Sequence, residues 1–219
     1  MYKIVELLDL SHTIAEPLFE GREYPWEVLG GIKEFILALG PALPAEEFDN
    51  PSEGVWIAKD AKVFPSAYIG APCIIDHGAE VRHCAFIRGS AIVGKDCVVG
   101  NSVELKNAVL FDNVQVPHYN YVGDSILGYK SHMGAGSITS NVKSDKTLVV
   151  VKNGSERIET GLKKFGAILG DHVEVGCNSV LNPGSVLGRE VSVYPTSSVR
   201  GVVPAGCIYK SEGNIVERK

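Results

Sequence analysis

Between residues 57 and 116 the sequence repeats with a period of six residues. Every sixth position carries a large apolar side chain, and these ten positions are Ile57, Val63, Ile69, Ile75, Val81, Ile87, Val93, Val99, Leu105 and Phe111. Because 45% of the chain is hydrophobic, ten such residues in succession would arise by chance roughly 3 times in 10,000. A second series, four residues further on, is small or of modest size up to its last member, Gln115.

A period of six matches neither an amphipathic helix nor a simple alternating strand. It is typical of a parallel β-helix, in which each short strand places one large aliphatic and one small residue inside before the chain turns a corner. The 24 glycines suit a fold rich in corners, because glycine adopts positive φ without steric cost. The repeat returns near Leu127 and again from Leu169 to Val199, which gives eighteen intact hexads. We therefore predict a β-helix domain over residues 55–210.

Residues 1–54 lie outside the repeat and are predicted to form an N-terminal cap and linker. Tyr2–Leu10 alternates weakly, as a short strand would. From Pro25 the apolar residues follow helical spacing, and Gly40 with Pro41 ends that pattern. We expect the helix to cover an open end of the coil, since repeat folds need their terminal core covered. A partner-binding surface is the alternative for this segment.

Residues 139–168 interrupt the six-residue pattern. Asn153 and Gly154 stand between apolar stretches, a combination that predicts a β-hairpin. A long loop inside a compact domain is usually functional, and a tolerated surface insertion is the alternative. Residues 211–219 are predicted to form a C-terminal tail.

Composition and charge narrow the class of protein. A net charge of −5 argues against a nucleic-acid-binding surface. The sequence shows neither a signal peptide nor a membrane-spanning run. Its five cysteines have no C-x-x-C spacing, and Cys73 and Cys97 fall on the small inward series. We expect reduced, structural cysteines and hence a cytoplasmic protein.

The break in the repeat at residues 117–121 is the strongest candidate site. His118 lies there, and an imidazole can accept a proton from an attacking amine or hydroxyl at neutral pH. Arg88 and Lys106 each follow an inward aliphatic residue and are eighteen residues apart, so three hexads per turn would stack them. Two stacked cations suit a phosphate-bearing substrate. We expect the three groups on one edge of the coil; a structural histidine and ordinary surface cations are the alternative.

Three sequence runs resemble a known family. They are VGNSVELKNAVL from Val99, PHYNYVGDSILG from Pro117 and HMGAGSITSN from His132. In order and spacing they resemble the acetyltransferase half of the bifunctional enzyme that makes UDP-N-acetylglucosamine, a glucosamine-1-phosphate acetyltransferase joined to a uridylyltransferase. The resemblance covers about residues 57–210. It implies an all-β, left-handed parallel β-helix that works as a homotrimer, with sites between neighbouring subunits.

The resemblance also implies roles for individual residues. The catalytic base falls on His118, which would take a proton from the acceptor amine as the nitrogen attacks the thioester of acetyl-CoA, without a metal. The implied contacts to an amino-sugar phosphate or sugar nucleotide fall on Arg88, Lys106, Tyr121, His132 and Asn141. The implied contacts to acetyl-CoA fall on Ala135, Cys177, Pro195 and Lys210. No Gly-rich nucleotide loop precedes the coil, so we expect no nucleotidyltransferase activity.

Several positions depart from the family pattern. His132 replaces an Asn, Val142 a Tyr, Cys177 a Ser and Pro195 an Ala. These changes cluster around the donor and acceptor contacts, so the acceptor is the least defined part of the prediction. One alternative function is a non-catalytic, sugar-nucleotide-binding or regulatory β-helix that serves a nucleotidyltransferase partner.

Two further alternatives use the same scaffold. A zinc enzyme of the γ-carbonic-anhydrase type would need three histidines converging across a trimer interface. His77, His83 and His118 are the residues to consider, although the first two fall on adjacent faces of the coil. A purely structural trimer is the last alternative.

Overall fold

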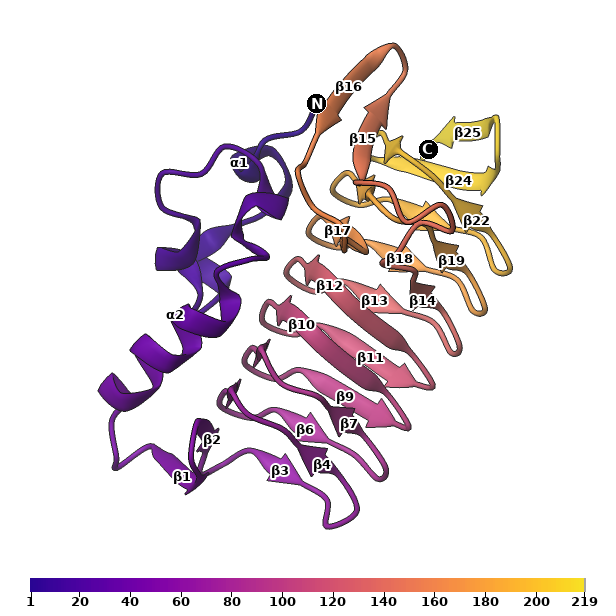
Figure 1. Cartoon of the computed structure of the whole chain (residues 1–219). Helices are drawn as coiled ribbons and strands as arrows, with labels where there is room; N and C mark the ends of the chain where they lie inside the picture. Colours follow the sequence, from indigo (N-terminus) through magenta and orange to yellow (C-terminus); the bar gives the residue numbers. More distant parts are fainter. Residues whose placement is uncertain (219) are drawn as a thin grey trace.

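The hexapeptide repeat winds into a three-sided coil of short parallel strands, shown in Figure 1. The computed structural model describes residues 1–218. Along most of the coil one turn takes three hexads: Val63 pairs with Val81, and Ile69 with Ile87, each eighteen residues on. The predicted fold class, a left-handed parallel β-helix with a short helical N-terminal segment and an inserted hairpin, is confirmed.

Each side of the coil is a ladder of parallel strands. The first face contains β3 (Lys62–Val63), β6 (Glu80–Val81), β9 (Val98–Asn101), β11 (Gln115–His118), β13 (His132–Met133), β18 (Glu174–Val175), β21 (Ser192–Val193) and β24 (Cys207–Ser211). The second contains β4 (Tyr68–Ile69), β7 (Phe86–Ile87), β14 (Ile138–Thr139), β19 (Val180–Leu181) and β22 (Ser198–Val199). The third contains β2 (Val55–Ala58), β5 (Cys73–Ile75), β8 (Ala91–Val93), β17 (Ala167–Leu169), β20 (Ser185–Leu187) and β23 (Val202–Val203).

Two long strands join the second and third faces. β10 (Glu104–Leu110) and β12 (Tyr121–Leu127) run along the second face and continue around the corner into the third. The inward residues Val81, Ile87 and Val99 are fully buried. This aliphatic stack is the core that the six-residue period predicts.

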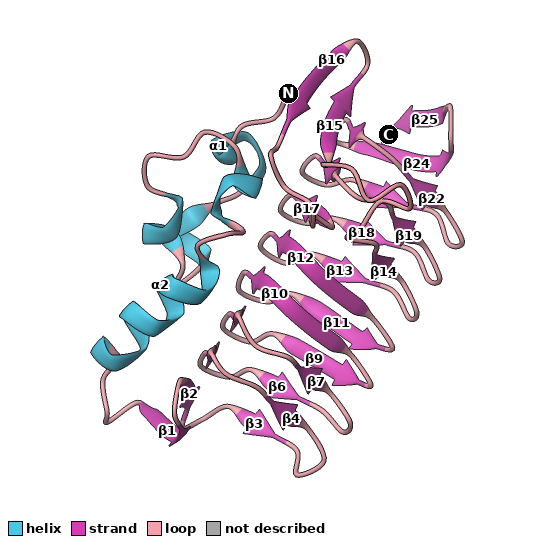
Figure 2. Cartoon of the chain, in the orientation of Figure 1, coloured by secondary structure: helices cyan, strands magenta, loops and turns pink. Residues whose placement is uncertain are grey.

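The third face is apolar on its outer side as well. Its outward positions are Ile74, Ile92, Val109, Ile126, Ile168 and Val186, and all six are fully buried. Three of them, Ile92, Val109 and Ile126, lie on strands that the N-terminal segment contacts: α2 (Ile32–Leu39) packs on β8 and β10, and the 3-10 turn Pro25–Val28 packs on β12. Figure 2 shows this helical segment beside the coil.

The expectation that the helix covers an open end of the coil is therefore wrong. The outward apolar row of the third face requires cover on the side of the coil, and the N-terminal segment provides it over β8, β10 and β12. The first turn stays more open, since Ile57, Val63 and Ile69 are only partly buried.

The N-terminal elements differ from the sequence prediction in two places. Tyr2–Leu10 contains α1 (Ile4–Leu7) and no strand, because the Glu6 carboxylate caps the helix by accepting from the Lys3 backbone N–H at 2.7 Å. The helix expected from Pro25 is divided: a 3-10 turn covers Pro25–Val28 and α2 begins only at Ile32. Gly30 and Gly31 separate them, since glycine is a poor helix former. The predicted helix end at Gly40 is confirmed.

Four more strands flank or interrupt the coil. β1 (Phe48–Ser52) lies within the predicted linker and pairs antiparallel with β2. β15 (Val150–Asn153) and β16 (Glu156–Glu159) form the hairpin predicted at Asn153 and Gly154, with Gly154 at a φ of 59°. In the predicted tail, β25 (Asn214–Glu217) pairs antiparallel with β24. None of the helices within residues 1–218 has the length and apolarity that crossing a membrane requires.

A buried carboxyl group at a corner of the coil leads to a pH-dependent prediction. Asp76 is 1% exposed, and its Oδ2 atom has no hydrogen-bond partner within residues 1–218. Burial raises the pKa of Asp76 above its ordinary value. Because this pKa is higher in the folded than in the unfolded protein, the folded protein loses stability as the pH rises and the carboxyl group ionises. Asp76→Asn should therefore raise the melting temperature at pH 7, and the gain should shrink as the pH falls toward about 4.

Thermal unfolding followed by circular dichroism at several pH values tests this prediction. Asp49→Asn, at an exposed position in β1, is the control and should leave the melting temperature unchanged. A gain for Asp76→Asn that is equally large at acid pH would show that ionisation is not its cause.

Candidate functional site

Two corners of the coil border the second face, and the predicted site residues divide between them. The His118 edge is the corner where the first face ends. Along it the Gly136 N–H donates to the His118 carbonyl at 3.0 Å, the Asn178 N–H to the Ala135 carbonyl at 2.9 Å, and the Thr196 N–H to the Cys177 carbonyl at 2.8 Å. The turns carrying Ala135, Cys177 and Pro195 are thereby stacked in one column above His118.

Lys210 extends the same column. It follows Tyr209, which pairs with Val193, and so lies level with Tyr194. The Lys210 ammonium is 5.8 Å from the centre of the Tyr194 ring. The four residues predicted to contact acetyl-CoA thus lie along one edge that begins at His118.

His118 is held by its backbone, and its side chain is exposed. The buried Asn120 side chain accepts from the His118 N–H at 3.1 Å and donates to the Gly134 carbonyl at 2.8 Å. Within residues 1–218 the imidazole itself makes no hydrogen bond. The corner is therefore rigid while the ring remains available to a ligand.

The Lys106 edge is the corner where the second face ends. Ile87 pairs with Leu105, so Arg88 and Lys106, which follow them, are stacked as predicted. Lys106 in turn pairs with Gly123.

His118 does not share this edge, and that part of the prediction is wrong. Residues 117–120 form the corner that precedes the second face, whereas the two cations stand where that face ends. Gly123, level with Lys106, follows His118 by five residues, so the two corners are at most about 17 Å apart along the face. A ligand that contacts both must lie across the second face.

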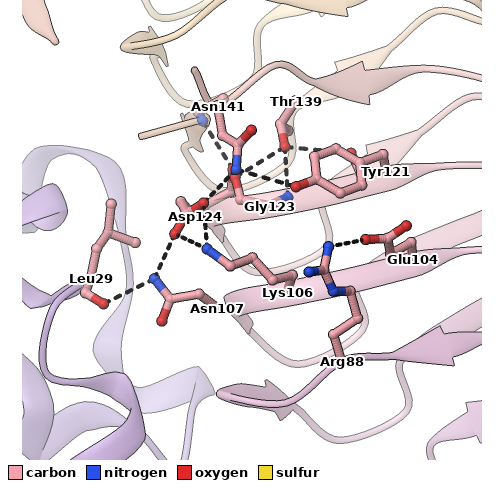
Figure 3. Close-up of polar contacts among 12 residues, drawn as sticks. Leu29, Arg88, Glu104, Lys106, Asn107, Tyr121, Gly123, Asp124, Thr139 and Asn141 are labelled. Carbon is pink, nitrogen blue, oxygen red and sulfur yellow. Dashed lines mark hydrogen bonds and ion pairs between the residues drawn. The ribbon is translucent and has the colours of Figure 1, made fainter. Parts of the chain in front are cut away.

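A buried carboxylate organises the Lys106 edge, as Figure 3 shows. Asp124 is 3% exposed and accepts from the Lys106 ammonium at 2.8 and 2.9 Å. Its carboxylate also accepts from the side-chain amides of Asn107, at 3.0 Å, and Asn141. The Asn107 amide donates in addition to the Leu29 carbonyl at 3.0 Å, which connects the cluster to the N-terminal segment. Sequence reasoning missed Asp124 and Asn107, although both lie in the quoted runs.

Tyr121, the first residue of β12, also contacts this cluster. Its hydroxyl accepts from the Asn141 amide at 3.2 Å, and its ring packs on Gly123, where an added Cβ would collide with the phenol. Burial raises the pKa of Tyr121, and the charges of Asp124 and Glu104 add to this effect, so the phenol keeps its proton at neutral pH. Arg88 is exposed and donates to Glu104 at 2.8 Å.

His132 is not brought into this group. It lies on the first face, where its Nδ1 atom is 2.8 Å from Glu174 Oε2. The His77 Nδ1 atom lies 2.9 Å from the Asp60 carboxylate, and the His83 ring packs at a tilt against the Phe64 ring, with ring centres 4.3 Å apart. In the part of the chain that the structure describes, no three His, Cys, Asp or Glu side chains are grouped to hold a metal ion.

Comparisons with known proteins show a family match and several relatives. The model of the family described as GMPPB C-terminal domain matches residues 69–211. The bifunctional sugar-1-phosphate nucleotidylyltransferase/acetyltransferase of Sulfurisphaera tokodaii is 33% identical over 71% of this chain and 39% of its own length. The bifunctional protein GlmU of Methanococcus maripaludis is 28% identical over 99% of this chain and 53% of its own length. The chain thus spans about half the length of these relatives or less.

The solved structures that match the chain are more distant in sequence. The acetyltransferase domain of PglB from Neisseria gonorrhoeae, in complex with acetyl coenzyme A, is 15% identical, covers 75% of this chain and 57% of its own, and has a TM-score of 0.33. The UDP-N-acetylglucosamine acyltransferase of Francisella novicida is 13% identical, covers 72% and 62%, and has a TM-score of 0.45.

The relatives confirm the resemblance to the bifunctional nucleotidyltransferase/acetyltransferase that the sequence motifs indicate. The family match extends from β4 to the end of β24 and includes both edges of the second face. Because that match covers well over half of the sequence, the chain belongs to the family of the GMPPB C-terminal domain.

Proposed function

We propose that this protein transfers an acetyl group from acetyl-CoA to the amino group of an amino-sugar phosphate or a sugar nucleotide. The observation that carries this proposal is the position of His118. Its exposed imidazole, without a hydrogen-bond partner in residues 1–218, begins the edge on which Ala135, Cys177 and Pro195 are stacked. The relative named as a bifunctional sugar-1-phosphate nucleotidylyltransferase/acetyltransferase supports the same activity.

The donor would lie along the His118 edge. From His118 to Lys210 the column rises four rungs, about 19 Å at the usual spacing of neighbouring strands. That length suits the extended arm of CoA. The thioester would then lie beside Ala135, one rung from His118, and the Lys210 ammonium would meet a CoA phosphate at the far end.

The acceptor would lie across the second face. Its phosphate would contact Arg88 and Lys106, which present a guanidinium and an ammonium on one edge. Tyr121 and Asn141 would contact the sugar, and Asp124 would hold Lys106 in position. The amino group would then point toward His118 at the opposite corner.

Direct transfer of the acetyl group needs only the acceptor amine, the thioester, His118 and a backbone N–H. His118 takes a proton from the amine as the nitrogen attacks the thioester carbon. A backbone N–H near Ala135 stabilises the oxyanion that forms. The tetrahedral intermediate then collapses and the carbon–sulfur bond breaks. The CoA thiolate takes up the proton that His118 accepted, and CoA leaves as the free thiol. This chemistry requires no metal ion.

The assembly would be a homotrimer in which the second face packs against a neighbouring subunit. Tyr68 and Phe86 are paired on the outer side of that face and are 62% and 42% exposed. Large apolar side chains at such exposure are typical of interfaces. His132, on the first face, would contribute to an acceptor site only from a neighbouring subunit.

Turnover of acetyl-CoA tests the proposed function. CoA thiol release is measured with a panel of acceptors: glucosamine 1-phosphate, nucleotide-activated amino sugars and an amino sugar without phosphate. Release with a phosphorylated acceptor supports the proposal. Binding of a sugar nucleotide with no thiol release from any acceptor would instead identify the non-catalytic β-helix.

Arg88→Ala should mainly raise the KM for a phosphorylated acceptor, by about tenfold, since one charged contact to phosphate is worth about 1.4 kcal/mol or more. Arg88 is the cleaner choice of the two cations because it is exposed. Loss of Lys106 would leave the buried Asp124 without its ion pair and would also destabilise the fold. Steady-state kinetics with an unphosphorylated amino sugar provides the control, and an equal loss there would refute the phosphate role.

A further inference from the structure

A second site lies between the inserted segment and the coil. A cavity of about 520 Å³ opens there, and its wall includes four cationic side chains: Lys143, Lys152, Arg157 and Arg200. Among the described residues that line it, none is acidic. The volume falls in the usual range for small-molecule sites. Figure 1 shows the β15–β16 hairpin beside the C-terminal turns of the coil.

The charges in this cavity are unbalanced. Lys152 and Arg157 are directly opposite each other across the β15–β16 hairpin, and both line the cavity. Like charges in that position destabilise a strand pair. Within residues 1–218, neither of them nor Arg200 forms a salt bridge, while Lys143 lies 3.3 Å from Asp145. A bound anion would balance this arrangement.

The cavity continues the Lys106 edge. Tyr121 pairs with Ile138, Thr139 with Leu181 and Leu181 with Val199. The residues that follow these strands, Ser140, Asn182 and Arg200, are therefore stacked in the same column as Lys106, and all three line the cavity. Arg200 stands four rungs from Lys106, about 19 Å.

The cavity is also separate from the proposed CoA column, because it stands at the other corner of the second face. Part of its wall is apolar: Val142, which is 40% exposed, together with Val150 and Pro183. Such a wall can accept a flat ring next to a cationic centre. A guanidinium group can donate two parallel hydrogen bonds to two oxygens of a phosphate.

We propose that this cavity binds the diphosphate of a nucleotide, with the nucleoside against Val142 and Pro183. Two molecules could bring such a group: a nucleotide-activated sugar and CoA itself. The position on the Lys106 edge favours the nucleotide-activated sugar, and this choice of source rests on the proposed function. The diphosphate of a sugar nucleotide would then lie in this cavity, and Arg88 and Lys106 would contact the phosphate only when the acceptor is a sugar 1-phosphate. The binding of a nucleoside diphosphate does not depend on the proposed function, so it can be tested without measuring acetyl transfer.

Calorimetric titration of the full chain with UDP, GDP, inorganic pyrophosphate and CoA, each alone, tests the proposal. We expect at least one nucleoside diphosphate to bind. Arg157→Gln and Arg200→Gln should each weaken that binding by about tenfold. Lys33→Gln, which removes an equal charge from an exposed position on α2, should leave it unchanged.

The two sources give different patterns. If the two arginine variants weaken only UDP or GDP binding, the ligand is the sugar nucleotide. If they weaken only CoA binding, the diphosphate belongs to CoA. If none of the four probes binds, or if the variants bind all of them as the parent does, the site does not exist.

Thermal unfolding separates binding from a structural role. Without ligand, Arg157→Gln should keep or slightly raise the melting temperature, because it removes the repulsion from Lys152. With ligand, the rise in melting temperature seen for the parent protein should be lost. A lower melting temperature of the unliganded variant would show that Arg157 stabilises the fold, which would overturn the proposal.

Discussion

His118→Ala should lower the rate constant for acetyl transfer by about two to four orders of magnitude, the usual contribution of a positioned general base. The change should leave the fold intact, because the imidazole is exposed and makes no hydrogen bond within residues 1–218. Its backbone is held by Asn120, which the substitution does not touch. Thiol release from acetyl-CoA gives the rate, and the melting temperature shows that the variant is folded.

His83 offers a matched control on the same edge. The Ser102 N–H donates to the His83 carbonyl and the Tyr119 N–H to the Asn101 carbonyl, so His83 stands two rungs below His118 in one column. Its side chain is also exposed. His83→Ala should keep full activity. An active His118→Ala variant would remove the base from the mechanism, and equal losses in both variants would point to a general effect on the edge.

The coil could be predicted from the sequence because its cause is local and repeated. One inward aliphatic residue every six positions is enough to define the turn, as the pairing of Val63 with Val81 shows. The same repeat does not show which hexads carry an apolar residue on the outer side of the coil. Ile74 and Ile92 lie one position before inward residues and create a second buried surface. That surface, unnoticed in the sequence, decides where the N-terminal helix packs.

The site was predictable in part for the same reason. The stacking of Arg88 on Lys106 follows from register alone. The position of His118 does not, because it depends on which corner the residues before Tyr121 form. The role of Asp124 depends on side chains from β10 and from the loop after β14, and on its own backbone, which has a φ of 49°. No six-residue pattern carries that information.

Val81→Asp should prevent the coil from folding. Val81 is fully buried and pairs with Val63 and Val99, so its neighbours within the stack are aliphatic. A carboxylate there has no partner, and burying an unpaired polar or charged group costs at least several kcal/mol. A typical domain has only about 5–15 kcal/mol of stability. Circular dichroism should show loss of the strand signal or a much lower melting temperature.

Two control variants separate the effect of the buried charge from the effect of losing the valine side chain. Val81→Ala removes two methyl groups and should cost about 2 kcal/mol, so it should still fold. Glu80→Asp, one position away on the outer side of the same strand, should change little. The buried carboxyl of Val81→Asp would have a raised pKa, so its protonation at acid pH should restore part of the lost stability. A variant that unfolds cooperatively at the parent's melting temperature would mean that position 81 does not face the core, and the register of the whole coil would have to change with it.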